Sequence, residues 1–99
     1  MSFLYLPPLL NTEITATTQI FVKGAELWYI HIMNTDAAAV TTITCRNGTT
    51  DGSTVYFTVR VGIGLDYDFV FPNPLYFPTA LRVVVAGGTV IIDIGWRKW

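Results

Sequence analysis

The sequence contains one histidine and one cysteine, and these two residues bound the chemistry that a single chain can perform. His31 has no second histidine with which to build a metal site, and nothing in the sequence marks a nucleophile for it to activate. Cys45 has no nucleophile motif around it, so we interpret it as a small buried strand residue. We therefore predict that the protein is not an enzyme and that it binds no cofactor and no metal ion.

Two carboxylates, Asp66 and Asp68, are spaced so that a strand would place them on one face, about 7 Å apart. Such a pair occurs in glycosidases and in calcium sites, but further acidic ligands at metal-loop spacing are missing. We instead interpret the two aspartates as part of a solvent-exposed strand edge, or as partners for Arg60 or Arg82. Gly62-Ile63-Gly64 lacks the third glycine and the following helix of a phosphate-binding loop.

Charged residues make up only 13% of the 99 residues, whereas 52% are hydrophobic. An ordinary soluble domain has about 25% charged residues. A domain of this size buries only about 60–65% of the surface that its unfolded chain exposes. One small core therefore does not hide all of the apolar side chains, and the surplus is expected to contact other protein chains, a ligand or a membrane.

The charge and cysteine counts exclude several classes of protein. Six basic and seven acidic residues give a net charge of −1 without a basic cluster, so we expect no nucleic-acid partner. A single cysteine forms no intrachain disulfide, which fits folding in a reducing cytoplasm. No run of 18 apolar residues occurs, so we expect no membrane-spanning helix and no membrane partner.

Stretches rich in Val, Ile, Thr, Tyr and Phe alternate with turn residues, and no window of eleven residues has helical periodicity. Seven or eight short antiparallel strands at this spacing form a sandwich or a barrel, so we predict an all-β fold. Gly87-Gly88 between two Val- and Ile-rich runs predicts a hairpin. The predicted strands are Gln19–Lys23, Leu27–Asn34, Ala39–Arg46, Thr54–Val61, Tyr67–Phe71, Ala80–Ala86 and Thr89–Arg97, with Leu75–Phe77 as a candidate eighth.

Residues 1–18 are predicted to form an extended N-terminal arm, and residues 19–99 a single β domain. Pro7-Pro8 favours the polyproline II conformation, and the segment lacks the basic residues and the cleavage site of a signal peptide. We expect the arm to reach a neighbouring subunit through its large apolar side chains, which are Phe3, Leu4, Tyr5 and Leu6.

Several strands carry apolar residues on both faces, which indicates a second covered face. Residues 83–85 and 90–92 are apolar throughout. An isolated antiparallel sandwich normally alternates between dry and wet positions, so a subunit contact is the simplest cover. In Leu27–Asn34, alternation places Trp28 in the core with Ile30 and Ile32. The opposite face, which we expect at an interface, carries Tyr29, His31 and Met33.

The C-terminal segment adds two more aromatic candidates, Trp96 and Trp99, which we expect to pack against a neighbouring chain. Two alternatives remain open for them. They could pack in the chain's own core, or they could stack on the rings of a bound carbohydrate, since sugar-binding modules use exposed aromatic side chains.

Two stretches resemble a known family. Residues 24–39, and most specifically Asn34-Thr35-Asp36-Ala37-Ala38, resemble the opening of small jelly-roll-like proteins in the virions of tailed bacteriophages. Residues 74–83 resemble a later stretch of those proteins, although Pro74 and Ala80 stand where they often have glycine. The resemblance covers roughly residues 24–93.

The resemblance implies a jelly-roll-like antiparallel β-sandwich that acts as a virion structural protein, often a capsid decoration (cement) protein. It further implies a homo-oligomer, frequently a trimer, that binds the major capsid protein or another virion protein after assembly in the bacterial host cytoplasm. The family pattern carries no catalytic residues. The second hypothesis that we weigh is a head- or tail-associated carbohydrate-binding or receptor-binding module.

Overall fold

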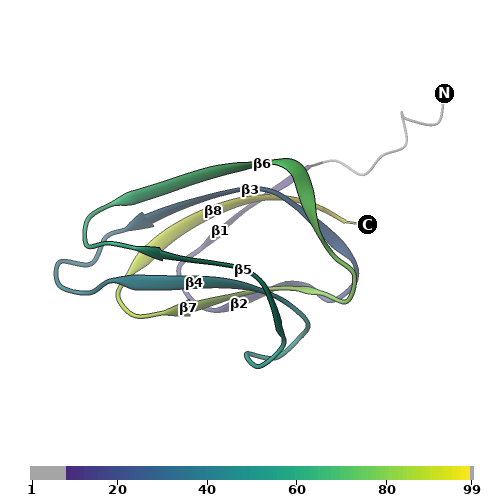
Figure 1. Ribbon diagram of the computed structural model, residues 1–99, viewed down its shortest axis with the longest axis horizontal. Coiled ribbons are helices and arrows are strands. Elements are labelled where there is room, and N and C mark those ends of the chain that lie inside the picture. Colours follow the sequence, from purple (N-terminus) through teal and green to yellow (C-terminus); the bar gives the residue numbers. More distant parts are fainter. Residues whose placement is uncertain (1–8, 99) are drawn as a thin grey trace.

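The computed structural model describes residues 9–98, which form eight antiparallel strands and no helix. The strands build two four-stranded sheets that pack face to face (Figure 1). The first sheet has the order β1-β8-β3-β6 and the second sheet the order β2-β7-β4-β5. The strands are β1 (Leu10–Ile14), β2 (Thr18–Phe21), β3 (Ala25–Asn34), β4 (Thr41–Asn47), β5 (Thr54–Val61), β6 (Asp66–Phe77), β7 (Leu81–Ala86) and β8 (Val90–Lys98).

The predicted all-β sandwich is therefore confirmed, and all seven predicted strands are present. The predicted bounds of β5, Thr54–Val61, coincide with those observed. The predicted strand Tyr67–Phe71 and the short piece at Leu75–Phe77 are one strand, β6. Pro72 and Pro74 are tolerated within it because β6 is an edge strand, and its pairing with β3 is interrupted between Val70 and Leu75.

The prediction of an extended arm over residues 1–18 is wrong from Leu10 onward. Residues Leu10–Ile14 form β1, which pairs with β8 in the register Leu10↔Trp96 to Ile14↔Ile92. In β1 the side chains of Asn11 and Glu13 are exposed whereas Ile14 is buried, which is the alternation of a half-buried strand. The sandwich thus begins before Gln19, while Phe3, Leu4, Tyr5, Leu6 and Trp99 lie outside the described residues.

The position of Trp28 also differs from the prediction. A register shift between Leu27 and Tyr29 interrupts the strict alternation of β3, so Leu27 occupies the core. Trp28 is half-buried outside the core cluster, where its Nε1 donates to Glu26 Oε1 at 3.2 Å. The Arg97 guanidinium lies 5.1 Å from the centre of the Trp28 ring, a cation–π contact.

The core lies between the two sheets and is built from the inward-facing aliphatic and aromatic side chains of both. β3 contributes Leu27, Ile30 and Ile32, all fully buried. Burying each such side chain contributes about 1.5–3 kcal/mol. The remaining buried members are Ile14, Ala25, Ile43, Cys45, Val61, Phe77, Leu81, Val83, Val90, Ile92, Ile94 and Trp96.

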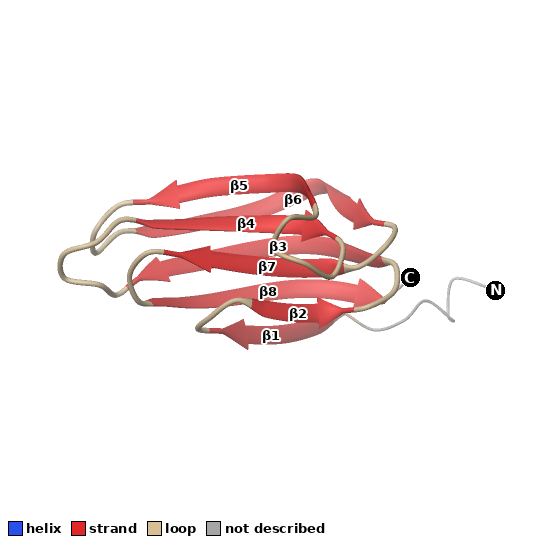
Figure 2. Cartoon of the chain, turned by 90° about the horizontal axis from the view of Figure 1, so that it is seen from below, coloured by secondary structure: helices blue, strands red, loops and turns tan. Residues whose placement is uncertain are grey.

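The sandwich has two sides at which the edge strands of the two sheets lie next to each other. β1 and β2 form one margin, called here the β1/β2 side, and β5 and β6 form the other, the β5/β6 side (Figure 2). Because each of these four strands ends a sheet, each has one edge without a neighbouring strand in residues 9–98. The two sides differ in the number of exposed apolar side chains that their strands carry.

Candidate functional site

The outer face of the first sheet carries a row of ionisable side chains, one from each strand. The cross-strand register aligns Glu13 of β1 with Asp93 of β8, and aligns His31 of β3 with both Asp93 and Asp68 of β6. Directly opposed side chains in such a row lie about 4.5–5.5 Å apart at their Cβ atoms. Asp66 approaches the same histidine, with its Oδ2 at 3.9 Å from His31 Nε2. Three carboxylates, those of Asp66, Asp68 and Asp93, therefore flank His31, and Glu13 lies one strand beyond Asp93; together they make this face acidic.

Tyr29 lies beside this row and covers the backbone of β8. A Cβ atom added at Gly95 would collide with the Tyr29 ring, so the ring rests directly over that glycine. The Tyr29 hydroxyl donates to Asn11 Oδ1 on β1, so the side chain spans β8 and its far end is fixed. Glycine at position 95 is thus required by the aromatic ring that packs on it.

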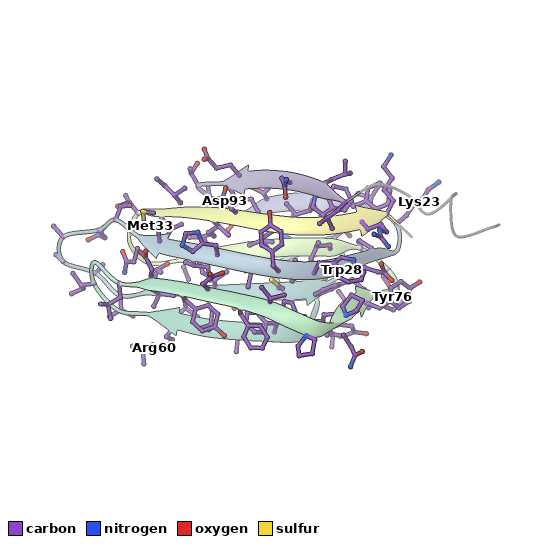
Figure 3. All side chains as sticks on the ribbon, turned by 90° about the horizontal axis from the view of Figure 1, so that it is seen from above. Lys23, Trp28, Met33, Arg60, Tyr76 and Asp93 are labelled. Carbon is purple, nitrogen blue, oxygen red and sulfur yellow. The ribbon has the colours of Figure 1, made fainter. Side chains whose placement is uncertain are left out.

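These residues line a shallow, open hollow of about 460 Å³ on the outer face of the first sheet. Figure 3 looks onto this face, with Asp93 and Met33 among its labelled residues. The hollow offers one aromatic ring with amide, imidazole and carboxylate groups, which can stack on a ligand and form hydrogen bonds with it. Its lining includes no serine, threonine, cysteine or lysine; it consists of Asn11, Tyr29, His31, Asp68 and Asp93.

The structure brings three of the predicted interface residues together. Tyr29, His31 and Met33 alternate along β3 and share the outer face of the first sheet, each half-buried. Their shared face is as predicted, and their place in an interface stays a prediction. No group of three or more histidine, cysteine, aspartate or glutamate side chains in the described part of the chain is arranged to hold a metal ion.

Trp96, by contrast, is not available to a neighbour or to a ligand. Its side chain is 6% exposed and belongs to the core cluster of its own chain, which corrects the prediction of interchain packing. The indole Nε1 donates to Thr12 Oγ1 at 2.9 Å, and the ring lies 5.3 Å from the Phe21 ring. Because β8 is a central strand of the first sheet, its inward side chains face the second sheet, where a large indole fills the space near the β1/β2 side.

The β5/β6 side carries a cluster of aromatic rings that are only partly buried. Phe57 of β5 lies 5.3 Å from the Phe71 ring, 6.3 Å from the Phe69 ring and 6.4 Å from the Tyr67 ring of β6. These four residues form what is called here the β5/β6 aromatic cluster. The rings fill the gap between the two sheets at the margin where no further strand covers them, so each retains some exposure.

Exposed apolar side chains gather on the same side. Of the ten large hydrophobic side chains that are exposed in residues 9–98, six belong to β5, β6 or the turn between them. This surface was not predicted from the sequence, although the adjacent apolar residues of β5 and of the β5–β6 turn indicate it. The six are Val55, Tyr56, Ile63, Leu65, Val70 and Tyr76.

The outer face of the second sheet has the opposite charge from that of the first. Arg46 and Arg82 face each other across β4 and β7, and Arg60 is exposed near the end of β5. Arg82 Nε lies 2.7 Å from Asp51 Oδ1, and Arg46 Nη1 donates to the Ser53 carbonyl at 2.6 Å. Arg60 is therefore the most accessible of the three arginines.

The segment that carries the family resemblance forms a firmly bonded turn between β3 and β4. Asn34 is 2% exposed, and its Nδ2 donates to the Val61 carbonyl at 3.0 Å and to the Ala39 carbonyl at 2.9 Å. The Asp36 carboxylate accepts from the backbone N–H groups of Ala38 and Ala39. These hydrogen bonds, with that from Ala38 the strongest cause, hold the pKa of Asp36 below its ordinary value.

Cys45 lies in the core, which agrees with its interpretation as a buried strand residue. Burial penalises the thiolate and raises the pKa of the Cys45 thiol to about 12. The thiol therefore stays protonated at neutral pH. A protonated, inaccessible thiol is a poor nucleophile.

The comparisons with known proteins give a limited result. No family model matches the sequence, and no curated protein matches it significantly. Among solved structures, the chain is similar to one from the study entitled "Bacillus endospore appendages form a novel family of disulfide-linked pili". The TM-score is 0.43 at 11% sequence identity, covering 94% of this chain and 91% of that chain. None of the described residues forms a helix long and apolar enough to cross a membrane.

Proposed function

We propose that the protein is a structural subunit of a phage virion, of the capsid decoration type, which self-associates and binds the major capsid protein or another virion protein. The observation that carries this proposal is the concentration of exposed apolar side chains on the β5/β6 side. Monomeric proteins rarely expose a large contiguous apolar patch, and such patches mark interaction sites.

The composition supports the same role. Charged residues are only 13% of the chain, and four of the acidic ones lie on the same face as His31. Much of the remaining surface is therefore uncharged. Burying apolar surface in an interface contributes about 25 cal/mol per Å² before the costs of association. For a subunit with few charges, assembly therefore lowers the free energy relative to the separate chains.

The family resemblance of Asn34-Thr35-Asp36-Ala37-Ala38 favours a virion protein over other assemblies. In this chain the segment builds a tight turn, in which buried Asn34 links the end of β3 to the end of β5. A turn of this kind stabilises a rigid sandwich through its internal hydrogen bonds. Such a role suits a protein whose work is to hold other chains in place.

The test is to purify virions from a lysate in which this protein is produced and to quantify the protein in them by mass spectrometry. We expect it to co-purify with heads at a copy number comparable to that of the major capsid protein. Virions that lack the protein would overturn the proposal. The control is the unassembled fraction of the same lysate, in which an abundant contaminant would be equally enriched.

A second candidate function, carbohydrate binding, is favoured by the hollow at Tyr29. The aromatic ring packs against Gly95, and the same hollow is lined by the hydrogen-bonding groups of His31, Asp68 and Asp93. Aromatic faces beside carboxylates and amides are the groups that stack on and hydrogen-bond to sugar rings. The location differs from the predicted one, because Trp96 is buried in the core.

A glycan array tests this candidate directly. We expect the Tyr29→Ala variant to lose any binding that the parent protein has. Tyr56→Ala removes an exposed aromatic side chain of the second sheet and should leave binding unchanged. An array without bound glycans, or binding that Tyr29→Ala preserves, would exclude the hollow as a carbohydrate site.

A further inference from the structure

The β5/β6 side combines three features that a single chain leaves incomplete. β5 and β6 each have one edge with no neighbouring strand in the described residues, so a row of backbone groups on each edge is unpaired by other strands. Such an edge is a template for pairing with another chain. Between the two edges lies the half-buried β5/β6 aromatic cluster, and around them lie six exposed apolar side chains.

We infer that this side binds the same side of a second copy of the chain. The two copies are related by a two-fold axis parallel to the strands, so that β6 of each copy lies antiparallel to β5 of the other. This inference rests on the proposed role as an assembly subunit and assigns the surface through which the subunit first associates. Pairing on the free edge of β6 involves residues 66–71, because Pro72 and Pro74 further along the strand donate no backbone N–H. The two aromatic clusters then cover each other.

The orientation of the axis follows from charge. A second two-fold arrangement, with the axis perpendicular to the sheets, would pair β5 with β5 and β6 with β6, also antiparallel. Backbone pairing alone does not distinguish the two. β5, β6 and the turn between them contain only three charged residues, and these decide between the arrangements: they are Arg60, Asp66 and Asp68.

Within one chain Arg60 and Asp68 lie near the same end of the sandwich but on opposite outer faces. Arg60, which is labelled in Figure 3, is on the second sheet in register with Thr42, and Asp68 is on the first sheet in register with His31. When the axis is parallel to the strands, the first sheet of one copy continues into the second sheet of the other. Arg60 of each copy then lies beside Asp66 and Asp68 of the other, and the pairing occurs twice.

The perpendicular axis offers no such match. It would place the acidic beginning of β6 beside the uncharged end of the same strand in the other copy. Arg60 would lie toward the uncharged beginning of β5. Charge complementarity across an interface selects the orientation and register of the partners, so it favours the axis parallel to the strands.

Sedimentation velocity over a range of protein concentrations tests the inference. The expected species has the mass of two chains. Arg60→Asp places like charges beside Asp66 and Asp68 twice and should raise the dissociation constant at least about tenfold. The double variant Arg60→Asp with Asp68→Arg should restore most of the affinity, because each new aspartate then meets the other copy's new arginine.

Two further variants complete the design. Glu13→Arg changes an exposed charge on the β1/β2 side and should leave the association unchanged. Asp68→Arg alone, at an exposed position of β6, places like charges beside Arg60 of the other copy and should weaken the association about as much as Arg60→Asp does, with unfolding little altered. It keeps the inference testable if an Arg60 variant folds poorly.

The outcomes separate this inference from the proposed function. A protein that is monomeric at every concentration overturns the inference, whatever the virion measurement gives. A trimer, or a dimer that Arg60→Asp does not weaken, also overturns it and leaves the assembly role standing. A dimer weakened by Arg60→Asp and restored by the charge exchange supports it even if the protein is absent from virions.

Discussion

The two sides of the sandwich are built from the same kind of element, a pair of edge strands, yet they are closed in different ways. On the β1/β2 side Ile14 and Trp96 are almost fully buried, and the Thr17 hydroxyl in the connecting turn accepts from Val85 N–H at 2.9 Å. On the β5/β6 side the Phe57 and Phe69 rings remain partly exposed.

The difference lies in how much each side hides with its own side chains. The β1/β2 side has a large indole from a central strand and a short turn that is bonded to β7. The β5/β6 side has four aromatic rings along its open margin and exposed Val70 and Leu65 beside them. The surplus of apolar residues in the composition is thus not spread evenly over the surface. Much of it lies on β5, β6 and the turn between them, where no further strand of residues 9–98 covers it.

The largest effect is expected from Trp96→Ala, which removes the side chain that closes the β1/β2 side. Truncating a buried tryptophan costs about 3–5 kcal/mol, because it leaves a cavity and, here, removes the partner of Thr12. Urea unfolding followed by circular dichroism measures the loss. Trp28→Ala, which removes the same side chain outside the core cluster, should cost clearly less; equal losses would contradict the assignment of Trp96 to the core.

The next largest effect is expected from Asn34→Ala, which cuts the link between the β3–β4 turn and the β5/β6 side. The side chain donates to Val61 and Ala39 and accepts from the backbone N–H of Asp36. Losing these bonds leaves buried backbone groups without partners and should lower the free energy of unfolding by about 2–3 kcal/mol. Asn73→Ala, at an exposed position of β6, is the matched control and should be nearly neutral.

A smaller effect on stability is expected from Phe69→Ala on the β5/β6 side. Since the ring is already partly exposed in one chain, its truncation should cost about 1–2 kcal/mol in dilute solution, well below the cost at Trp96. If this side self-associates, the cost should grow with protein concentration. Urea unfolding at two widely separated concentrations measures both quantities, and a cost as large as that of Trp96→Ala would mean that the two sides are equally closed.

The smallest effect is expected at the turn that contains Asp36. Backbone hydrogen bonds lower its pKa from 3.8, so the ionised form is preferred in the folded state. A depressed folded pKa means that its contribution to stability is fully present above about pH 4 and is lost as the pH falls through the folded pKa. Asp36→Asn should flatten the acid limb of a plot of thermal midpoint against pH. An acid limb identical to that of the parent would show that Asp36 contributes nothing.

Local sequence features predicted the strands well because β-branched runs and turn residues act within a few positions. Thr54–Val61 is bounded by such signals and was predicted with its observed bounds. Leu10–Ile14 was not predicted as a strand. The stretch has only a short alternation of apolar and polar residues, and it follows Pro7-Pro8, which favour an extended arm. The position of Trp28 was wrong because alternation was extended through a register shift that β3 has against both of its neighbours, β6 and β8.

The candidate surfaces were predicted only in part. Tyr29, His31 and Met33 share a face because alternation along one strand is a local property. The carboxylates on the same face as His31 come from β1, β6 and β8, so no spacing in the sequence brings them together. The requirement for glycine at position 95 was not predictable from neighbouring residues either, because the ring that packs on it is that of Tyr29 on another strand.

The sequence by itself determined that this chain is an antiparallel β protein with a single histidine, a buried thiol and more apolar residues than a small core can hide. These properties follow from composition and from a period of two residues. Only the tertiary structure decided which strands lie at the edges of the sheets, and therefore which apolar residues remain uncovered. Strand order is set by contacts between residues far apart in the chain, because burial and hydrogen bonding are optimised over both sheets at once.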